Sequence, residues 1–149
     1  SISTTLEGAG IKPAGPPDTY IGVVHGMLPG VSILAAARPA VPMAFAFLAA
    51  HVLECALKAY LSREGSDERL TKSPLRHDLV GLWRLAASEG LPVVAEPPVW
   101  VVRLGEVHGR PYYLRYSTGV HGINLPPSGI VIAELTALVD AMRVGTRSE

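Results

Sequence analysis

The densest group of side chains that can carry out chemistry lies between residues 107 and 121, in the segment VHGRPYYLRYSTGVH. It contains no acidic residue, and its arginines, histidines and tyrosines are Arg110, Arg115, His108, His121, Tyr112, Tyr113 and Tyr116. Arginine presents a planar fork to phosphate, histidine exchanges a proton near neutral pH, and tyrosine stacks on a base or hydrogen-bonds a phosphate oxygen. This composition favours binding of RNA or a nucleotide. The alternative is that the tyrosines pack the segment against the protein while the arginines are solvated.

A second polar group follows one stripe of an otherwise apolar segment. His51, Glu54, Cys55 and Lys58 occupy positions i, i+3, i+4 and i+7, which share one face of a helix. Cys55 is expected to be a small buried hydrophobe, whereas the other side chains need polar partners. We expect a hydrogen-bonded network that fixes the register of two helices, with a ligand or metal site as the alternative. Its predicted members are His51, Glu54, Lys58, His77 and Asp78.

Some of the same residues suggest a metal-dependent enzyme. His51, the pair His77 and Asp78, and the late Asp140 occur in the order used by HD-type phosphohydrolases, which act through metal-bound water. In that class the His-Asp pair usually lies inside an apolar helix, whereas here it follows the polar run from Lys72. This hydrolase is therefore our third hypothesis. The two preferred hypotheses require no metal and no cofactor.

Apolar periodicity predicts the elements that must position these residues. The first half of the second predicted helix is apolar on all sides, which is typical of a central helix. We expect helices from Asp18, as N-cap, to Arg38 with a kink or break at Pro29 and Gly30, from Val41 to Arg63, from Leu75 to Ser88, from Pro97 to Val107 with a short strand as the alternative, and from Ser128 to Arg143. The fold class is therefore all-α, a four- or five-helix bundle over residues 18–149, with residues 1–17 as an extended or mobile arm.

Composition limits the classes of function. The chain has 149 residues, of which 48% are hydrophobic, and its 13 basic residues balance 13 acidic ones. A chain without net charge has no global attraction to polyanions, so any site for nucleic acid must be local. The opening residues lack a signal-sequence pattern, which predicts a cytoplasmic location. Residues 41–61 carry His51, Glu54 and Lys58, so we interpret them as a core helix and expect no membrane partner.

Two stretches of the chain resemble a known superfamily. The hairpin AAHVLECALKAYLSREG followed by LRHDLVGLWRLA is similar to the two core helices of HEPN domains, named for higher eukaryotes and prokaryotes nucleotide-binding. Arg115 and His121 are similar to the R-x(4-6)-H motif of that superfamily. The chain departs from the usual pattern because Tyr116 follows the arginine where a polar amide is common. The resemblance implies a HEPN-like helical bundle.

The resemblance also implies an activity. In active members, the motif residues of two subunits meet across a homodimer interface and cleave RNA without a metal. His121 would be the general acid/base for attack by a ribose 2′-hydroxyl, and Arg115 would stabilise the charge of the transition state. The predicted substrate-binding residues are Arg110, Tyr112, Tyr113, Tyr116 and His108. Other members are noncatalytic dimerisation or interaction modules, which is our second hypothesis, and an antitoxin-type protein is a further candidate partner.

Overall fold

The computed structural model describes residues 14–109, 112 and 124–147, and within these it contains five α-helices, one 3-10 turn and no strand. The predicted all-α bundle is therefore confirmed. The elements are α2 (Asp18–Ala35), α3 (Pro42–Leu61), the 3-10 turn η1 (Glu68–Leu70), α4 (Leu79–Ser88), α5 (Val99–His108) and α6 (Ser128–Arg147). Most of the predicted N-terminal arm lies outside the described residues.

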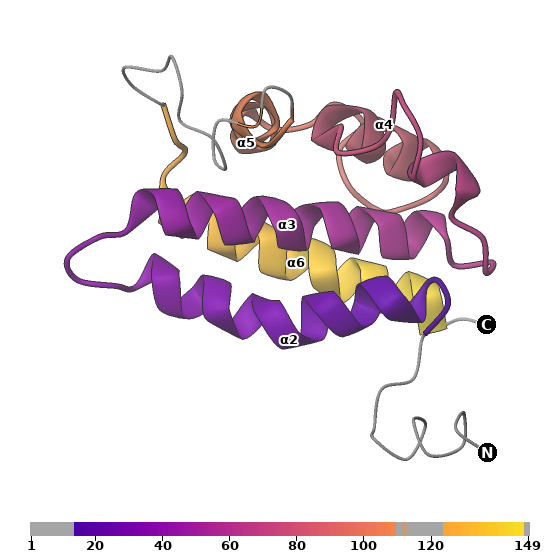
Figure 1. The fold of residues 1–149 in the computed structure, drawn as a ribbon, viewed down its shortest axis with the longest axis horizontal. Coiled ribbons are helices and arrows are strands. Elements are labelled where there is room, and N and C mark those ends of the chain that lie inside the picture. Colours follow the sequence, from indigo (N-terminus) through magenta and orange to yellow (C-terminus); the bar gives the residue numbers. More distant parts are fainter. Residues whose placement is uncertain (1–13, 110–111, 113–123, 148–149) are drawn as a thin grey trace, which may run out of the picture.

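Helix α3 is the central element of the bundle. It contacts all four other helices, with α2 along one side and with α4 and α5 on the opposite side (Figure 1). Most of its residues are buried, and from Val52 to Leu61 every residue is buried, whereas Met43 and Phe47 in the first turns are exposed. The helix is long and apolar enough to cross a membrane, but 78% of its most apolar window is buried inside the bundle. It has the character of a core helix, and it holds Glu54 and Lys58 in the interior.

Helix α2 differs from the prediction at its start, at its middle and at its end, which is Ala35 instead of Arg38. Pro17 occupies the N-cap position, and Asp18 lies in the first turn, where its negative charge suits the positive end of the helix dipole. Pro29 and Gly30 do not divide the helix, which is continuous from Asp18 to Ala35. Gly30 allows a close approach to α3, because a Cβ atom there would lie 3.1 Å from Cδ2 of Leu48.

Helix α4 begins four residues later than predicted, at Leu79 instead of Leu75. The Asp78 side chain caps the helix by accepting a hydrogen bond of 3.0 Å from the Gly81 N–H group, which fixes the start of the helix. Leu75 lies in the turn before the helix, where its side chain still packs against the core. His77 therefore lies in the turn that leads into α4.

Helix α5 forms where a strand was the alternative, and helix α6 is longer than predicted. Residues 99–108 form helix α5 and no strand, and the buried positions of Trp100, Val101, Leu104 and Val107 have helical spacing. Helix α6 runs to Arg147, beyond the predicted end at Arg143. The Thr146 hydroxyl donates a hydrogen bond of 3.0 Å to the Met142 carbonyl in this added turn.

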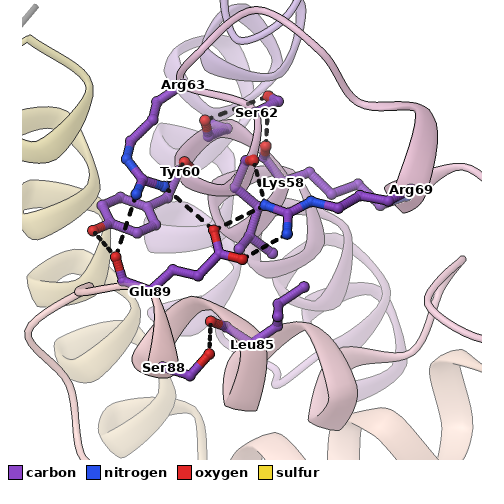
Figure 2. Close-up of polar contacts among 10 residues, drawn as sticks. Lys58, Tyr60, Ser62, Arg63, Arg69, Leu85, Ser88 and Glu89 are labelled. Atoms are coloured by element: carbon purple, nitrogen blue, oxygen red, sulfur yellow. Dashed lines mark hydrogen bonds and ion pairs between the residues drawn. The ribbon is translucent and has the colours of Figure 1, made fainter.

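An ion-pair cluster at the ends of α3 and α4 holds the connection between them (Figure 2). The Glu89 carboxylate accepts hydrogen bonds of 2.5 and 2.8 Å from the guanidinium of Arg69 in η1. Arg63 lies 3.7 Å from the same carboxylate, and its guanidinium stacks over the Tyr60 ring at 4.2 Å. The hydrogen bonds from Arg69, followed by the charges of both arginines, keep the pKa of Glu89 below its usual value despite partial burial. The cluster anchors η1 to both helices and steadies the segment that leads to His77.

Candidate functional site

Three elements bring polar side chains together around the carboxylate of Glu54. Glu54 is buried on α3 and accepts a hydrogen bond of 2.7 Å from Lys58, one turn along the same helix. His108, the last residue of α5, places its Nε2 atom 2.6 Å from Oε1 of Glu54. His77, from the turn before α4, places its Nδ1 atom 3.0 Å from Oε1 and 3.1 Å from Oε2. We call Glu54, Lys58, His77 and His108 the Glu54 network.

The electrostatics of the Glu54 network favour an ionised carboxylate. Burial by itself would raise the pKa of Glu54, but hydrogen bonds from His108, Lys58 and His77, together with the Lys58 charge, hold that pKa well below its usual range. An ionised carboxylate only accepts hydrogen bonds, so both imidazoles must donate to it. The proton is therefore on Nδ1 of His77 and on Nε2 of His108. The buried anion thus fixes the orientation and the tautomer of each histidine.

A cavity of about 540 Å³ opens directly beside this network. His77 lines it, and so do the cations Lys72 and Arg76, the hydroxyls of Thr71 and Ser73, and Tyr112 beyond the end of α5. Asp78 also lies on its wall, where one carboxylate oxygen already caps α4. The lining therefore offers mainly hydrogen-bond donors and positive charge.

The side chain of His77 is partly exposed at the cavity. It is 23% exposed, and its Nδ1 atom is engaged by Glu54. His77 lines the cavity, and in the described residues only its Nδ1 atom has a hydrogen-bond partner, which is the Glu54 carboxylate. In the neutral ring, a proton on Nδ1 leaves the lone pair on Nε2. His77 can therefore accept a proton or a hydrogen bond from a molecule in the cavity.

Backbone strain is concentrated at the same cavity. His77 and Tyr112, with φ angles of 64° and 65°, are the only residues other than glycine with positive φ in the part of the chain that the structure describes. This conformation is costly for residues with a Cβ atom, although histidine adopts it more readily than most, and strained residues tend to cluster at functional sites. The two rings pack edge to face at 6.1 Å between their centroids. The fold thus holds two strained aromatic residues against each other at the cavity wall.

The predicted network is brought together in part. Glu54, Lys58 and His77 are in contact, whereas Asp78 serves as the cap of α4. His51 lies one turn before Glu54 on α3, with its Nε2 atom 4.0 Å from the Cys55 sulfur. Cys55 is buried as predicted, and burial raises the pKa of its thiol to about 12, so it stays protonated and unreactive.

The predicted substrate-binding residues divide into three groups. Tyr112 lines the cavity. His108 was predicted to bind substrate, but it is buried and belongs to the Glu54 network. The other predicted residues, including the proposed catalytic pair, lie outside the described residues: Arg110, Tyr113, Arg115, Tyr116 and His121.

Comparisons of this chain with known proteins found no related protein. The chain matches no protein-family model, no curated protein and no solved structure. The HEPN resemblance consequently stays a prediction carried by residues 49–87 and by the Arg115 and His121 motif. Function has to be argued from the chemistry of the site itself.

The Glu54 network also contains a possible ligand set for a cation. The ligand atoms of Glu54, His77 and His108 lie within 4.8 Å of one another, and one carboxylate with two imidazoles suits a transition metal. The four residues of the HD-type hypothesis form a different set, and Asp140 is exposed on α6. The Lys58 ammonium, 2.7 Å from Glu54, already neutralises the one carboxylate in the set and would repel a divalent ion. The charges therefore favour a hydrogen-bonded network over a metal site.

Proposed function

We propose that this protein is a HEPN-like cytoplasmic homodimer that binds RNA or a nucleotide in the cavity beside His77. One observation carries the proposal. Gly109 and Tyr112, which flank the start of the arginine- and tyrosine-rich segment 110–121, line the same cavity as Lys72 and Arg76. The residues around the start of this segment and the pair Lys72 and Arg76 are far apart in the sequence, but they line one cavity.

The cavity lining suits a phosphodiester. Lys72 and Arg76 supply positive charge, and the Ser73 hydroxyl supplies a neutral donor for a phosphate oxygen. Tyr112 offers an aromatic ring on which a base can stack. The chain has no net charge, so attraction of a polyanion has to come from local cations such as Lys72 and Arg76.

The same proposal includes catalysis by the segment that follows Tyr112. His121 acts as a general acid/base and Arg115 stabilises the phosphorane-like transition state, so RNA is cleaved without a metal. Two copies of the chain would bring their motif residues together, and an antitoxin-type protein could cover the site. These roles rest on the resemblance and on the segment's origin at the cavity.

Binding of RNA is tested by removing the two cations of the cavity. The double variant Lys72→Ala/Arg76→Ala should bind a fluorescently labelled 2′-O-methyl RNA at least about tenfold more weakly, because phosphate contacts dominate nucleic-acid affinity. The slope of log Kd against log salt concentration should also fall by about two. Fluorescence anisotropy over a range of salt concentrations measures both quantities.

The control removes the same charge elsewhere. Arg38 and Arg84 are exposed and lie outside the cavity, so Arg38→Ala/Arg84→Ala should leave affinity within about twofold of the wild type. An equal loss in both double variants would mean that binding follows overall charge and would refute the cavity as the binding site.

A noncatalytic dimerisation module is the second candidate, and one apolar surface favours it. Val99 and Ile130 are 67% and 52% exposed, and they lie with Pro126 and Pro127 around a hollow between α5 and the start of α6. Exposed apolar side chains in one patch are typical of association surfaces. If this patch joins two copies, Val99→Asp/Ile130→Asp should convert a dimer to a monomer in light scattering. A wild-type monomer, or a dimer unaffected by these changes, would contradict that role.

A further inference from the structure

We infer that the cavity beside His77 binds a terminal phosphate, either of a nucleoside monophosphate or of a phosphorylated RNA end, and that His77 takes up a proton when the phosphate binds. The inference rests on the proposed function and names its ligand more closely. A phosphate monoester carries close to two negative charges at neutral pH and presents three terminal oxygens. A phosphodiester within an RNA strand carries only one charge, and two of its oxygens are free.

One backbone turn holds the two cations of the cavity near each other. The Arg76 N–H group donates a hydrogen bond of 3.1 Å to the Lys72 carbonyl, so the two residues stand at the ends of a single closed turn. Both are exposed and line the cavity, and neither forms a salt bridge within the part of the chain that the structure describes. Like charges that share one turn repel each other. A bound dianion offsets that repulsion more than a monoanion does.

The acidic residue on the cavity wall is already engaged. Asp78 accepts a hydrogen bond of 3.0 Å from the Gly81 N–H group, and its charge lies at the positive end of the α4 dipole. Its repulsion of a bound phosphate is reduced accordingly. The Ser73 hydroxyl on the same wall can donate to a phosphate oxygen.

His77 supplies the third positive group. Its ring lines the cavity and is 23% exposed, and its Nδ1–H group donates to Glu54 at 3.0 Å. A second proton converts the ring to an imidazolium, whose charge is spread over the whole ring at the cavity wall. Glu54 remains its hydrogen-bond acceptor, because Lys58 at 2.7 Å and His108 at 2.6 Å hold the carboxylate in place. The orientation of the ring is therefore the same in both protonation states.

The charges around His77 link its second proton to the ligand. The titratable and charged groups that face the imidazole from the neighbouring elements are Glu54 and Lys58 on α3, His108 at the end of α5, Tyr112 beyond it, and Lys72, Arg76 and Asp78 in its own segment. Lys58 already balances Glu54, and the two cavity cations oppose a further positive charge. A phosphate dianion in the cavity reverses this balance. Binding of the phosphate and binding of the proton therefore strengthen each other.

Matched ligands test the preference for a phosphate monoester. In isothermal titration calorimetry, the tighter-binding of uridine 5′- and 3′-monophosphate should bind the wild type at least about fivefold more tightly than its own methyl ester, which is a diester with one charge. Uridine, which lacks the phosphate, and inorganic phosphate, which lacks a base for Tyr112, should each bind at least about tenfold more weakly. Lys72→Ala/Arg76→Ala should lose at least about tenfold in affinity for the monophosphate, and Arg38→Ala/Arg84→Ala should stay within about twofold of the wild type.

Two RNAs distinguish the sources of the phosphate. One short 2′-O-methyl RNA carries a phosphate at both ends, and the other has the same sequence with hydroxyls at both ends. Binding of the phosphorylated RNA at least about fivefold more tightly would identify an RNA end as the ligand. A preference seen only with the mononucleotide would identify a free nucleotide. Either result supports the inference.

His77→Asn tests the proton-linked contact. Asparagine tolerates the positive φ at this position, so the variant should keep the wild-type circular dichroism. At pH 7 the wild type should take up about half a proton more than His77→Asn on binding the monophosphate, as measured by calorimetry in two buffers with different heats of ionisation. The variant should also bind about three- to tenfold more weakly. His25→Asn, which changes an exposed histidine of α2, should behave as the wild type.

The outcomes separate this inference from the proposed function. Equal affinity for the monophosphate and its methyl ester, together with equal affinity for the two RNAs, would overturn the preference for a terminal phosphate. If RNA binding then still depends on Lys72 and Arg76, the proposed function stands. Equal proton uptake by the wild type and His77→Asn would overturn the role of His77, and inorganic phosphate that binds as tightly as the monophosphate would overturn recognition of a nucleotide. Failure to bind any of these ligands would reject both.

Discussion

The Lys58→Met variant should unfold with a free energy about 3 to 5 kcal/mol lower than that of the wild type, because it leaves the buried Glu54 carboxylate without its ammonium partner. Methionine fills a similar volume, so packing around α3 should change little. Urea denaturation at pH 7 measures the difference. A loss of this size is a large part of the stability of an ordinary domain.

The expected dependence of this loss on pH follows from the lowered pKa of Glu54. A carboxyl group whose pKa falls on folding contributes stability above its unfolded pKa, and the contribution disappears as the pH falls through the folded value. The wild type should therefore keep its stability well into the acidic range. The lysine variant should lose less on acidification, because its unpaired carboxyl group can accept a proton at a higher pH.

The matched control is a double variant that changes Glu54 as well as Lys58. Glu54→Gln/Lys58→Met removes both charges together, so its destabilisation should be clearly smaller than the sum of the two single losses. Additive losses, or a Lys58→Met variant within about 0.5 kcal/mol of the wild type, would show that the ion pair is not central to the fold.

The Arg115→Ala and His121→Ala variants should each lose RNA cleavage by at least about 10²-fold without loss of stability. The expected loss for His121 corresponds to removal of a general acid/base, and that for Arg115 to removal of charge stabilisation in the transition state. Cleavage of an unmodified labelled RNA in the presence of a chelator measures the rates. Both residues lie outside the described residues, and their roles come from the motif.

The control for these variants is a change of the same type elsewhere. Arg84→Ala and His25→Ala remove exposed side chains on α4 and α2 and should cleave at the wild-type rate. If Arg115→Ala and His121→Ala retain full activity, the proposed ribonuclease mechanism is wrong. If the wild type cleaves RNA without the chelator but not with it, the reaction depends on a metal, and the HD-type hypothesis gains support.

Strong local patterns predicted most of the fold. The all-round apolar sequence of α3 predicted a central helix, and the structure places it in contact with every other helix. The predicted start of α4 was wrong because the sequence contains two possible helix starts. Pro74 with Leu75 looked like a helix start, but the Asp78 side chain caps the helix four residues later.

The candidate site was harder to predict because its residues are far apart in the sequence. Glu54 and Lys58 share a helix face, so their pairing follows from spacing. His108 lies 54 positions from Glu54, and no local pattern reveals that the end of α5 reaches α3. Its position beside the buried residues of α5 is the one local signal, and the polar segment that directly follows His108 obscures it.

Chemical-shift mapping tests RNA binding at the cavity most directly. We would titrate ¹⁵N-labelled protein with a short 2′-O-methyl RNA and follow its amide signals. We expect the largest shifts in residues 71–78 and 105–112, around Lys72, Arg76 and His77. Shifts centred on Val99 and Ile130 instead, or no shifts at millimolar RNA, would contradict a nucleic-acid site in this cavity.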